Sequence, residues 1–321
     1  MVVTLSIEKQ FSDSLKSIAR NLKMKEYIQQ SSELNPIFQR AAKRFVTGDL
    51  REDGVSVGNQ LIQKGYRISL EFIGENTINK EECLQAKDEF IALMKECGDR
   101  RLSARISFDL SHIGLSIEPG LAYQNLMEMA KEAQFHGLSL MISMEESAKT
   151  DQILAIYKKV AVDYSNVGIT LQAQLHRTFE DINELIHYPG AIRIVKGAYQ
   201  EPSDICTPRS EKLDQRYLEL VEICVKAGHQ VSIASHDNAI YEQVIERGFL
   251  RNPYVEAEML YGIRPEFCKK LKDEGLPVRV YLTYGVEWYL YLCHRIAEYP
   301  PNLYTAITDM ICGKGDSSQL Y

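Results

Sequence analysis

The sequence lacks the features that mark a nucleic-acid-binding, membrane-spanning or secreted protein. No stripe of lysine and arginine stands out, and the net charge of −7 disfavours a polyanionic partner. No apolar run approaches the ~18 residues that a membrane-spanning helix needs. The first fifteen residues show no basic segment followed by an apolar one. We therefore expect a cytoplasmic protein that binds no nucleic acid and has at most peripheral membrane contact.

Cysteine spacing also excludes a class of site, because none of the seven cysteines forms a CxxC pair or another metal-ligand pattern. They are Cys83, Cys97, Cys206, Cys224, Cys268, Cys293 and Cys312. An odd, scattered set inside predicted helices and strands indicates reduced thiols. Cys293 lies beside His294, but adjacent residues on a helix point about 100° apart, so a nucleophile–base pair is not expected here.

Neither nucleotide-binding fingerprint, GxGxxG or GxxxxGK[ST], occurs in the sequence. Their absence disfavours the alternative of a doubly wound open sheet. Instead, eight short apolar segments alternate with helical patterns over about 240 residues, which fits a (β/α)₈ barrel of typical length ~250 residues. The predicted strands are Arg67–Ile73, Arg105–Asp109, Ser139–Ser143, Gly168–Gln172, Ala191–Lys196, Gln230–Ala234, Tyr254–Met259 and Val278–Tyr281.

The same patterns divide the chain into three regions. Residues 1–60 read as an N-terminal helical arm, residues 61–312 as the barrel, and the polar residues 313–321 as a disordered tail. The hydrophobic content of 45% and the charged content of 25% are typical of a globular protein with an ample core.

The last strand and the helix that follows it gather polar side chains. Gly285 separates the strand from a predicted helix over Glu287–Glu298. Tyr291, His294, Arg295 and Glu298 lie within about 100° of one another on that helix. Tyr281, at the strand end, would point toward the same place, so these groups could hold a polar ligand. The alternative is a solvated face carrying an Arg295–Glu298 pair.

In a parallel barrel, functional residues gather where the strands end. Every predicted strand has polar residues at that end, which predicts a polar pocket. They are Glu71, Gly74 and Glu75, then Asp109 and His112, Ser143 and Glu145, Gln172 and Gln174, Arg193, Lys196 and Tyr199, Ser235, His236 and Asp237, Glu258 and Tyr261, and Tyr281 and Tyr284.

Two cations in the fifth strand are the most informative of these residues. Arg193 and Lys196 flank an apolar pair, and burying them is costly unless they meet an anion. Gly197 and Ala198 follow directly and would let a ligand approach the backbone. Phosphate or an electron-rich ring would satisfy both conditions. A zinc triad of His236, Asp109 and His112 stays open on residue type alone, although no spacing supports a metal.

Longer motifs resemble the flavin-dependent proline dehydrogenases. The matching segments lie in the same order and cover roughly residues 35–305: FIGE (Phe72–Glu75), ISFDLSHIGL (Ile106–Leu115), GITLQAQL (Gly168–Leu175), RIVKGAY (Arg193–Tyr199), ASHD (Ala234–Asp237), LYGIRPE (Leu260–Glu266) and YLTYGVEWYLYLCHRIAEYPPN (Tyr281–Asn302). The resemblance implies a distorted (β/α)₈ barrel that binds FAD at the strand ends. It also implies oxidation of proline to pyrroline-5-carboxylate, with electrons passed to a quinone.

The resemblance also implies roles for individual residues. Arg193 matches the arginine near flavin N5, where a cation stabilises the reduced ring. Lys196, Gln172, His236 and Glu298 match further cofactor residues, and Gly197, Ala198 and Ser235 adjoin them. On the substrate side, the matching residues are Tyr199 and Tyr281 in the pocket walls, Tyr291 on the last helix, and Arg295 as one of two arginines that clamp the proline carboxylate.

Three substrate positions depart from the family pattern. Asp109 stands where the family has lysine, Ser143 where it has aspartate, and His294 where it has the other clamp arginine. Arginine pairs hold carboxylates by charge-assisted bonds that a mostly neutral imidazole cannot supply. We therefore expect an amine or imino acid substrate whose carboxylate is masked, moved or missing, rather than free L-proline. The electron acceptor could be a quinone, oxygen or another molecule.

Two alternatives from other classes remain. One is a flavin-binding protein that has lost dehydrogenase chemistry and serves as a binding or regulatory module. The other is a metal-dependent barrel hydrolase, which the sequence supports least.

Overall fold

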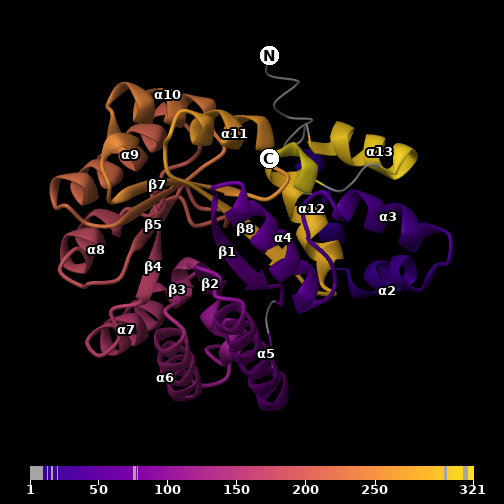
Figure 1. Ribbon diagram of the computed structural model, residues 1–321, viewed down its shortest axis with the longest axis horizontal. Helices are drawn as coiled ribbons and strands as arrows, with labels where there is room; N and C mark the ends of the chain where they lie inside the picture. Colours follow the sequence, from indigo (N-terminus) through magenta and orange to yellow (C-terminus); the bar gives the residue numbers. More distant parts are fainter. Residues whose placement is uncertain are drawn as a thin grey trace.

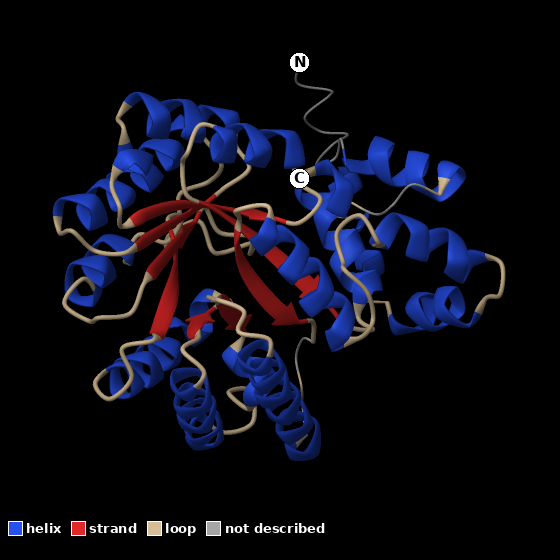
Figure 2. Ribbon diagram, in the orientation of Figure 1, coloured by secondary structure: helices blue, strands red, loops and turns tan. Residues whose placement is uncertain are grey.

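A closed barrel of eight parallel strands forms the centre of the computed structural model (Figures 1 and 2). The structure describes residues 10–321 except 13, 16, 20, 75, 76, 78, 300, 301 and 314–316. The strands are β1 (Arg67–Phe72), β2 (Ala104–Phe108), β3 (Ser139–Ile142), β4 (Val167–Gln172), β5 (Ile192–Val195), β6 (Val231–Ala234), β7 (Val255–Leu260) and β8 (Val278–Tyr284). The predicted (β/α)₈ barrel is confirmed.

The strands follow one another around the barrel in chain order, and β8 closes it by pairing with β1 from Arg67↔Arg279 to Phe72↔Tyr284. The predicted strand ends differ from the observed ones by at most one residue, except that β8 continues to Tyr284. Gly285 follows with a φ of +129°, a backbone conformation that favours glycine, and so ends the strand.

Helices cover the outside of the barrel, as the ring of blue ribbons around the red strands shows (Figure 2). The α-helices are α2 (Leu22–Gln30), α3 (Leu34–Ala42), α4 (Arg51–Gln63), α5 (Lys80–Asp99), α6 (Pro119–Phe135), α7 (Thr150–Ala161), α8 (Thr178–Leu185), α9 (Glu211–Lys226), α10 (Asn238–Glu246), α11 (Pro265–Asp273), α12 (Trp288–Glu298) and α13 (Asn302–Cys312). Short 3₁₀ helices are η1 (Leu110–Ile113), η2 (Ser147–Lys149), η3 (Phe249–Arg251) and η4 (Ser318–Leu320).

Helix α4 packs closely on the barrel through two glycines. A side chain at Gly58 would lie 2.7 Å from Ile68 Cδ1, and one at Gly54 would lie 3.0 Å from the Tyr284 ring. Only glycine lets the helix approach β1 and β8 this closely. The predicted boundary at residue 60 therefore falls inside a helix that packs against the barrel.

A second apolar cluster lies beside the barrel and joins the two ends of the chain. We call the four helices α2, α3, α12 and α13 the cap. They supply most of this cluster, including Ile28, Ala41, Trp288, Leu292 and Ala306. Figure 1 shows the indigo α2 and α3 beside the yellow α12 and α13. The Arg44 guanidinium after α3 binds both oxygens of the buried Asp309 carboxylate on α13, at 2.5 and 2.9 Å. The cap thus holds α12 in place.

The predicted disordered tail does not hold for residues 317–321, which are packed. The Tyr321 side chain is buried, and its hydroxyl accepts a hydrogen bond from the Gly262 N–H at 2.9 Å. Its ring stacks on Tyr261 and meets Tyr66 edge-on, both at 5.6 Å between ring centroids. A single aromatic anchor in a polar segment produces no periodic pattern, so sequence periodicity could not reveal it.

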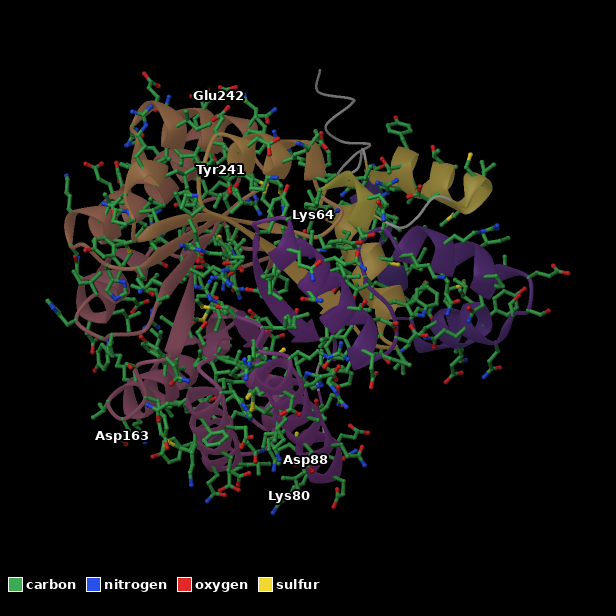
Figure 3. All side chains as sticks on the ribbon, in the orientation of Figure 1. Lys64, Lys80, Asp88, Asp163, Tyr241 and Glu242 are labelled. Carbon is green, nitrogen blue, oxygen red and sulfur yellow. The ribbon has the colours of Figure 1, made fainter. Side chains whose placement is uncertain are left out.

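The outer surface carries charged side chains, such as the exposed Lys80, Asp88 and Asp163 labelled in Figure 3. Among the described residues, no helix combines the length and the apolar character that crossing a bilayer requires.

The buried His112 on η1 makes stability depend on pH. Its ring stacks on Phe72 at 5.4 Å and meets Phe90 edge-on, and burial lowers its pKa to about 4. Between about pH 6.5 and pH 4, His112 is therefore protonated in the unfolded chain but neutral in the folded protein. Across this window we expect the proton uptake of His112 to remove roughly 2–4 kcal/mol of unfolding free energy.

Urea unfolding of the wild type and of His112→Gln at pH 7, 5.5 and 4.5 measures this effect. Because glutamine does not titrate, the stability advantage of the wild type should shrink as the pH falls, by up to ~1.4 kcal/mol per pH unit. An advantage that stays constant with pH would contradict the assignment.

Candidate active site

Five buried charged side chains cross the interior of the barrel in a continuous row of alternating sign. In order they are Arg279, Glu256, Arg105, Glu258 and Arg193, and we call them the charged row. None is more than 8% exposed. Burial alone would raise the pKa of Glu256, but Arg279 and Arg105 outweigh it and lower that pKa below its usual value. The ion pairs of the row connect Arg279 on β8 with Arg193 on β5.

Arg193 stands at the end of the charged row, below the carboxyl ends of the strands. Its Nε donates to Thr170 Oγ1 at 2.9 Å, and its Nη1 donates to Glu258 Oε1 at 3.2 Å and to Ser107 Oγ at 3.3 Å. Its Nη2 donates to Ser143 Oγ at 3.0 Å. Burial alone would lower the pKa of Arg193, but Glu258 and other neighbours raise it. Arg193 is thus a fixed, permanent cation.

Tyr281 on β8 lies directly over this cation. The Arg193 guanidinium carbon is 5.1 Å from the centre of the Tyr281 ring, and the Tyr281 hydroxyl donates to Glu71 Oε2 on β1 at 2.9 Å. Burial and the Glu71 carboxylate raise the pKa of Tyr281 well above its usual value, and the charge of Asp109 adds to this effect. Two carboxylates, Glu71 and Asp109, therefore act on one phenol.

Helix α12 brings Tyr291, Arg295 and Glu298 to the same region. Arg295 Nη2 binds Glu298 Oε1 at 2.7 Å, and its guanidinium carbon lies 4.8 Å from the centre of the Tyr291 ring. The charge of Glu71 acts on both Arg295 and Tyr291, which places their side chains near the end of β1. The Arg295–Glu298 pair considered as a surface feature does exist, but the Arg295 side chain is only 13% exposed. His294, on the same helix, is half-buried.

Lys196, directly after β5, pairs with carboxylates of two other segments. Lys196 Nζ binds Asp237 Oδ2 at 2.6 Å and also pairs with Asp214. Burial raises the pKa of Asp237, but Lys196 outweighs burial and lowers it. Gly197 has a φ of +110° and lies against the Gln174 side chain, while Ala198 is exposed. Both cations named from the fifth strand thus meet anions, as their burial requires.

His236 is a neutral acceptor in this structure. Its Nε2 accepts a hydrogen bond from the Leu260 N–H at 3.0 Å, which leaves the ring proton on Nδ1. Burial, together with Arg295 and Arg264, lowers the pKa of His236 to about 3. Ser235 Oγ accepts from the Asp237 N–H at 3.1 Å and so shapes the same turn.

Hydrogen bonds link the loops after β3, β4 and β5. Gln172 Nε2 donates to the Glu145 carbonyl at 2.8 Å, and Gln172 Oε1 accepts from Gln174 Nε2 at 3.3 Å. Gln174 Nε2 also donates to the Tyr199 carbonyl at 3.2 Å. Gln172 and Tyr199, both predicted site residues, are therefore positioned through Gln174.

The zinc alternative fails because its three residues do not meet. His112 packs between aromatic rings, and His236 Nε2 is occupied by a backbone N–H. Within the described part of the chain, no three histidine, cysteine or acidic side chains could hold a metal ion together.

Burial raises the pKa of Cys293 to about 11, so its thiol is a poor nucleophile. Glu75, named at the first strand end, lies outside the described residues.

The charged row shows what the sequence interpretation missed. Glu258 had been noted at a strand end, but Arg105, Glu256 and Arg279 had not been singled out. The signal was present: each is a charged residue inside an otherwise apolar strand, which was the reason for choosing Arg193.

Comparisons with known proteins agree with this geometry. The profile of the protein family described as Proline dehydrogenase matches residues 55–300. The chain belongs to the proline dehydrogenase family. Proline dehydrogenase 1 of Bacillus subtilis (strain 168) is 31% identical over 264 residues, 81% of this chain and 87% of that protein. Proline dehydrogenase of Deinococcus radiodurans is 31% identical over 281 residues, 85% of this chain and 90% of that protein.

Solved structures show the same fold. Proline utilization A from Bdellovibrio bacteriovorus, inactivated by N-propargylglycine, superposes with a TM-score of 0.76 at 17% sequence identity. The superposition covers 97% of this chain and 40% of that much longer one. Proline utilization A from Bradyrhizobium japonicum, as the mutant D778Y, gives a TM-score of 0.68 at 16% identity over 86% of this chain and 34% of that one. The family predicted from the sequence motifs is confirmed.

The residues present fit a flavin. A planar ring that gains negative charge on reduction needs a fixed cation, and Arg193 supplies one with a rigidly held guanidinium. Its hydrogen bonds to Thr170, Ser107, Glu258 and Ser143 use four of its five N–H groups. Lys196, Gln172 and the Ser235–His236 turn surround the same strand ends, where this family's fold places its ligand.

We expect Arg193→Ala to lose most of its FAD, because no other group replaces the planar cation. Arg193→Lys should keep part of it, since a point charge cannot reproduce the fork that Thr170, Glu258 and Ser143 hold. The ratio of FAD to protein after gel filtration measures this. Stoichiometric FAD and an unchanged absorption spectrum in Arg193→Ala would show that the residue is wrongly assigned.

We expect Arg295→Ala to weaken binding of an anionic substrate group or inhibitor by roughly 1.5–3 kcal/mol, the range for hydrogen bonds to charged groups. Titration of the flavin spectrum with a ligand measures the change. Glu298→Gln is the control, because it removes the partner charge and keeps the arginine. Equal ligand affinities in the wild type and Arg295→Ala would show that Arg295 does not bind the ligand and that its pair with Glu298 is only a structural contact.

Proposed function

We propose that this protein is a FAD-dependent oxidoreductase that oxidises a C–N bond in an amine or imino acid whose carboxylate is masked, moved or missing. As a member of the proline dehydrogenase family, the chain is a flavin-dependent enzyme. One observation carries the substrate proposal: Asp109, which replaces the family's lysine, acts electrostatically on Tyr281 together with Glu71.

The charges on the substrate side favour a cation over an anion. Arg295 is paired with Glu298, and Arg193 is paired with Glu258. Glu71 and Asp109 add two more carboxylates near Tyr281. A free carboxylate entering here would meet like charges in a poorly hydrated pocket, whereas an ammonium group would be attracted. This balance supports a substrate that enters as an amine without a free carboxylate beside it.

The chemistry requires removal of a proton from nitrogen and a hydride from the adjacent carbon, which leaves a C=N bond. When bound, FAD supplies the hydride acceptor and takes both electrons. Asp109 is the residue that we assign to accept the nitrogen proton, since an aspartate is a base and its charge acts on Tyr281. Tyr281, fixed by its bond to Glu71, forms one wall of the pocket, and Tyr199 and Tyr291 form others.

The alternative of a flavin-binding module without activity has less support. The three departures, Asp109, Ser143 and His294, all fall on substrate positions, whereas Arg193, Lys196, Gln172 and Glu298 match the family's cofactor positions. Loss of function would allow substitutions at both sets of positions alike.

Electrons from the reduced flavin pass to an acceptor, for which a quinone, oxygen or another small molecule is proposed.

We expect the wild type to be reduced slowly by L-proline and faster by L-prolinamide or pyrrolidine, in which the carboxylate is masked or missing. Asp109→Lys combined with Ser143→Asp and His294→Arg should reverse this preference, because it restores the charges that hold a carboxylate. The rate with L-proline divided by the rate with L-prolinamide should rise at least about tenfold, which corresponds to one charge-assisted bond. Anaerobic stopped-flow reduction of the flavin measures the rates.

The control is the conservative pair Asp109→Asn and Ser143→Ala, which should lower all rates without favouring L-proline. Neighbouring positions couple, so the single variants are measured as well. Fast, saturable reduction of the wild type at millimolar L-proline, with no advantage for the other two compounds, would overturn the substrate proposal and leave the ordinary family activity.

A further inference from the structure

Glu258 is the carboxylate on which the burial of Arg193 depends. Its Oε1 accepts from Arg193 Nη1 at 3.2 Å, and its Oε2 accepts from Arg105 Nη1 at 3.1 Å. Ser69 Oγ adds a contact to Oε1 at 3.4 Å. The side chain is 2% exposed. Glu258 therefore holds two arginines at once, one deep in the barrel and one at the site.

Arg193 has one carboxylate hydrogen-bond partner among the described residues, and it is Glu258. Its other partners, Thr170, Ser107 and Ser143, are neutral hydroxyls. Hydroxyls orient the guanidinium but do not offset its charge. Glu258 therefore has the largest effect on the electrostatic potential around Arg193.

The other half of the row limits how far Glu258 can compensate Arg193. Arg105 lies between two carboxylates, with its Nη2 at 3.1 Å from Glu256 Oε1. Burial and the nearby Arg279 lower the pKa of Arg105 to about 10. Within the row, three arginines share two carboxylates, which gives the row one excess positive charge, and the half-exposed Arg67 is a further partner of Glu256.

We propose that Glu258 is a positioning residue that aims the Arg193 guanidinium at the cofactor and sets the reduction potential of the flavin by offsetting the charge of Arg193. Arg105 in turn holds Glu258 in place. This inference rests on the proposed function to the extent that Arg193 faces the flavin.

The direction of the effect follows from charge. Reduced flavin carries negative charge that a neighbouring cation stabilises, and a carboxylate beside that cation weakens the stabilisation. Glu258→Gln keeps the volume of the side chain and removes its charge. The region around Arg193 then becomes more positive, and the reduced form is favoured.

Glu256→Gln is the matched control. Glu256 is equally buried and binds the same Arg105, and its other arginine partners are Arg279 and Arg67 rather than Arg193. Glu256 binds three arginines and Glu258 binds two, so the structural cost of Glu256→Gln is at least as large. A purely structural role for Glu258 therefore predicts that Glu258→Gln shifts the flavin potential no more than Glu256→Gln does.

The experiment measures the flavin reduction potential against a reference dye, together with the FAD dissociation constant and the apoprotein melting temperature. For Glu258→Gln we expect the ratio of reduced to oxidised flavin at fixed poise to rise at least tenfold, about 30 mV for a two-electron couple. Glu256→Gln should change it less than threefold. Equal changes in both variants, or none in Glu258→Gln, overturn the proposal.

Glu258→Asp decides the question if Glu258→Gln does not fold. It keeps the charge but withdraws it from Arg193 by one methylene, so the ratio should rise at least threefold above that of the wild type. An unchanged ratio overturns the proposal. A wild type that binds no FAD would instead overturn the proposed function, which keeps the two failures apart.

Discussion

The burial of Arg193 in a β-barrel depends on its ion pair with Glu258. A buried guanidinium without a counter-ion costs several kcal/mol, and strand positions in such barrels are usually filled by branched apolar residues. Here the pairing requires a second arginine to share Glu258 and a second glutamate to share that arginine. Ser69, Ser107, Thr170 and Ser232 occupy inward positions next to these charges and donate or accept hydrogen bonds to them. The polar interior of this barrel thus follows from the burial of Arg193 near the carboxyl ends of the strands.

The two sides of the active site are built from different parts of the molecule. Arg193, Tyr281 and Gln172 belong to the strands and are fixed by the closed barrel, whereas Tyr291, Arg295 and Glu298 belong to α12, which the cap holds through an apolar cluster of its own. The Arg44–Asp309 bond joins the beginning of that cap to its end. Because the cofactor side lies in the barrel, residues on the substrate side can change without altering the fold that positions the flavin.

How much of this could be predicted from sequence depends on how far apart the interacting residues lie. The alternation of apolar segments and helical patterns predicted β1 to β7 within one residue at each end, because each strand and its turn are local patterns. The polar face of α12 was visible for the same reason. The charged row was not: Arg105 meets Glu258 across 153 residues, and Arg193 meets it across 65. Such pairings follow from the closure of the barrel and from its register, neither of which a local pattern contains. Tyr321 likewise reaches its partner at Gly262 only through the tertiary fold.

One departure from the family pattern links the substrate and the cofactor. The motif resemblance matches Ser143 to an aspartate of the family, and the Ser143 hydroxyl accepts from Arg193 Nη2. An aspartate at this distance would be a second carboxylate on the same guanidinium and would offset its charge further. With serine, Arg193 keeps Glu258 as its main compensation, so the region is more positive toward the flavin, while Asp109 makes the substrate side more negative. The substitutions therefore move charge between the two sides of the site as well as changing what the pocket admits. The change of substrate that we propose for this chain is, on these grounds, coupled to a change in the electrostatics around Arg193.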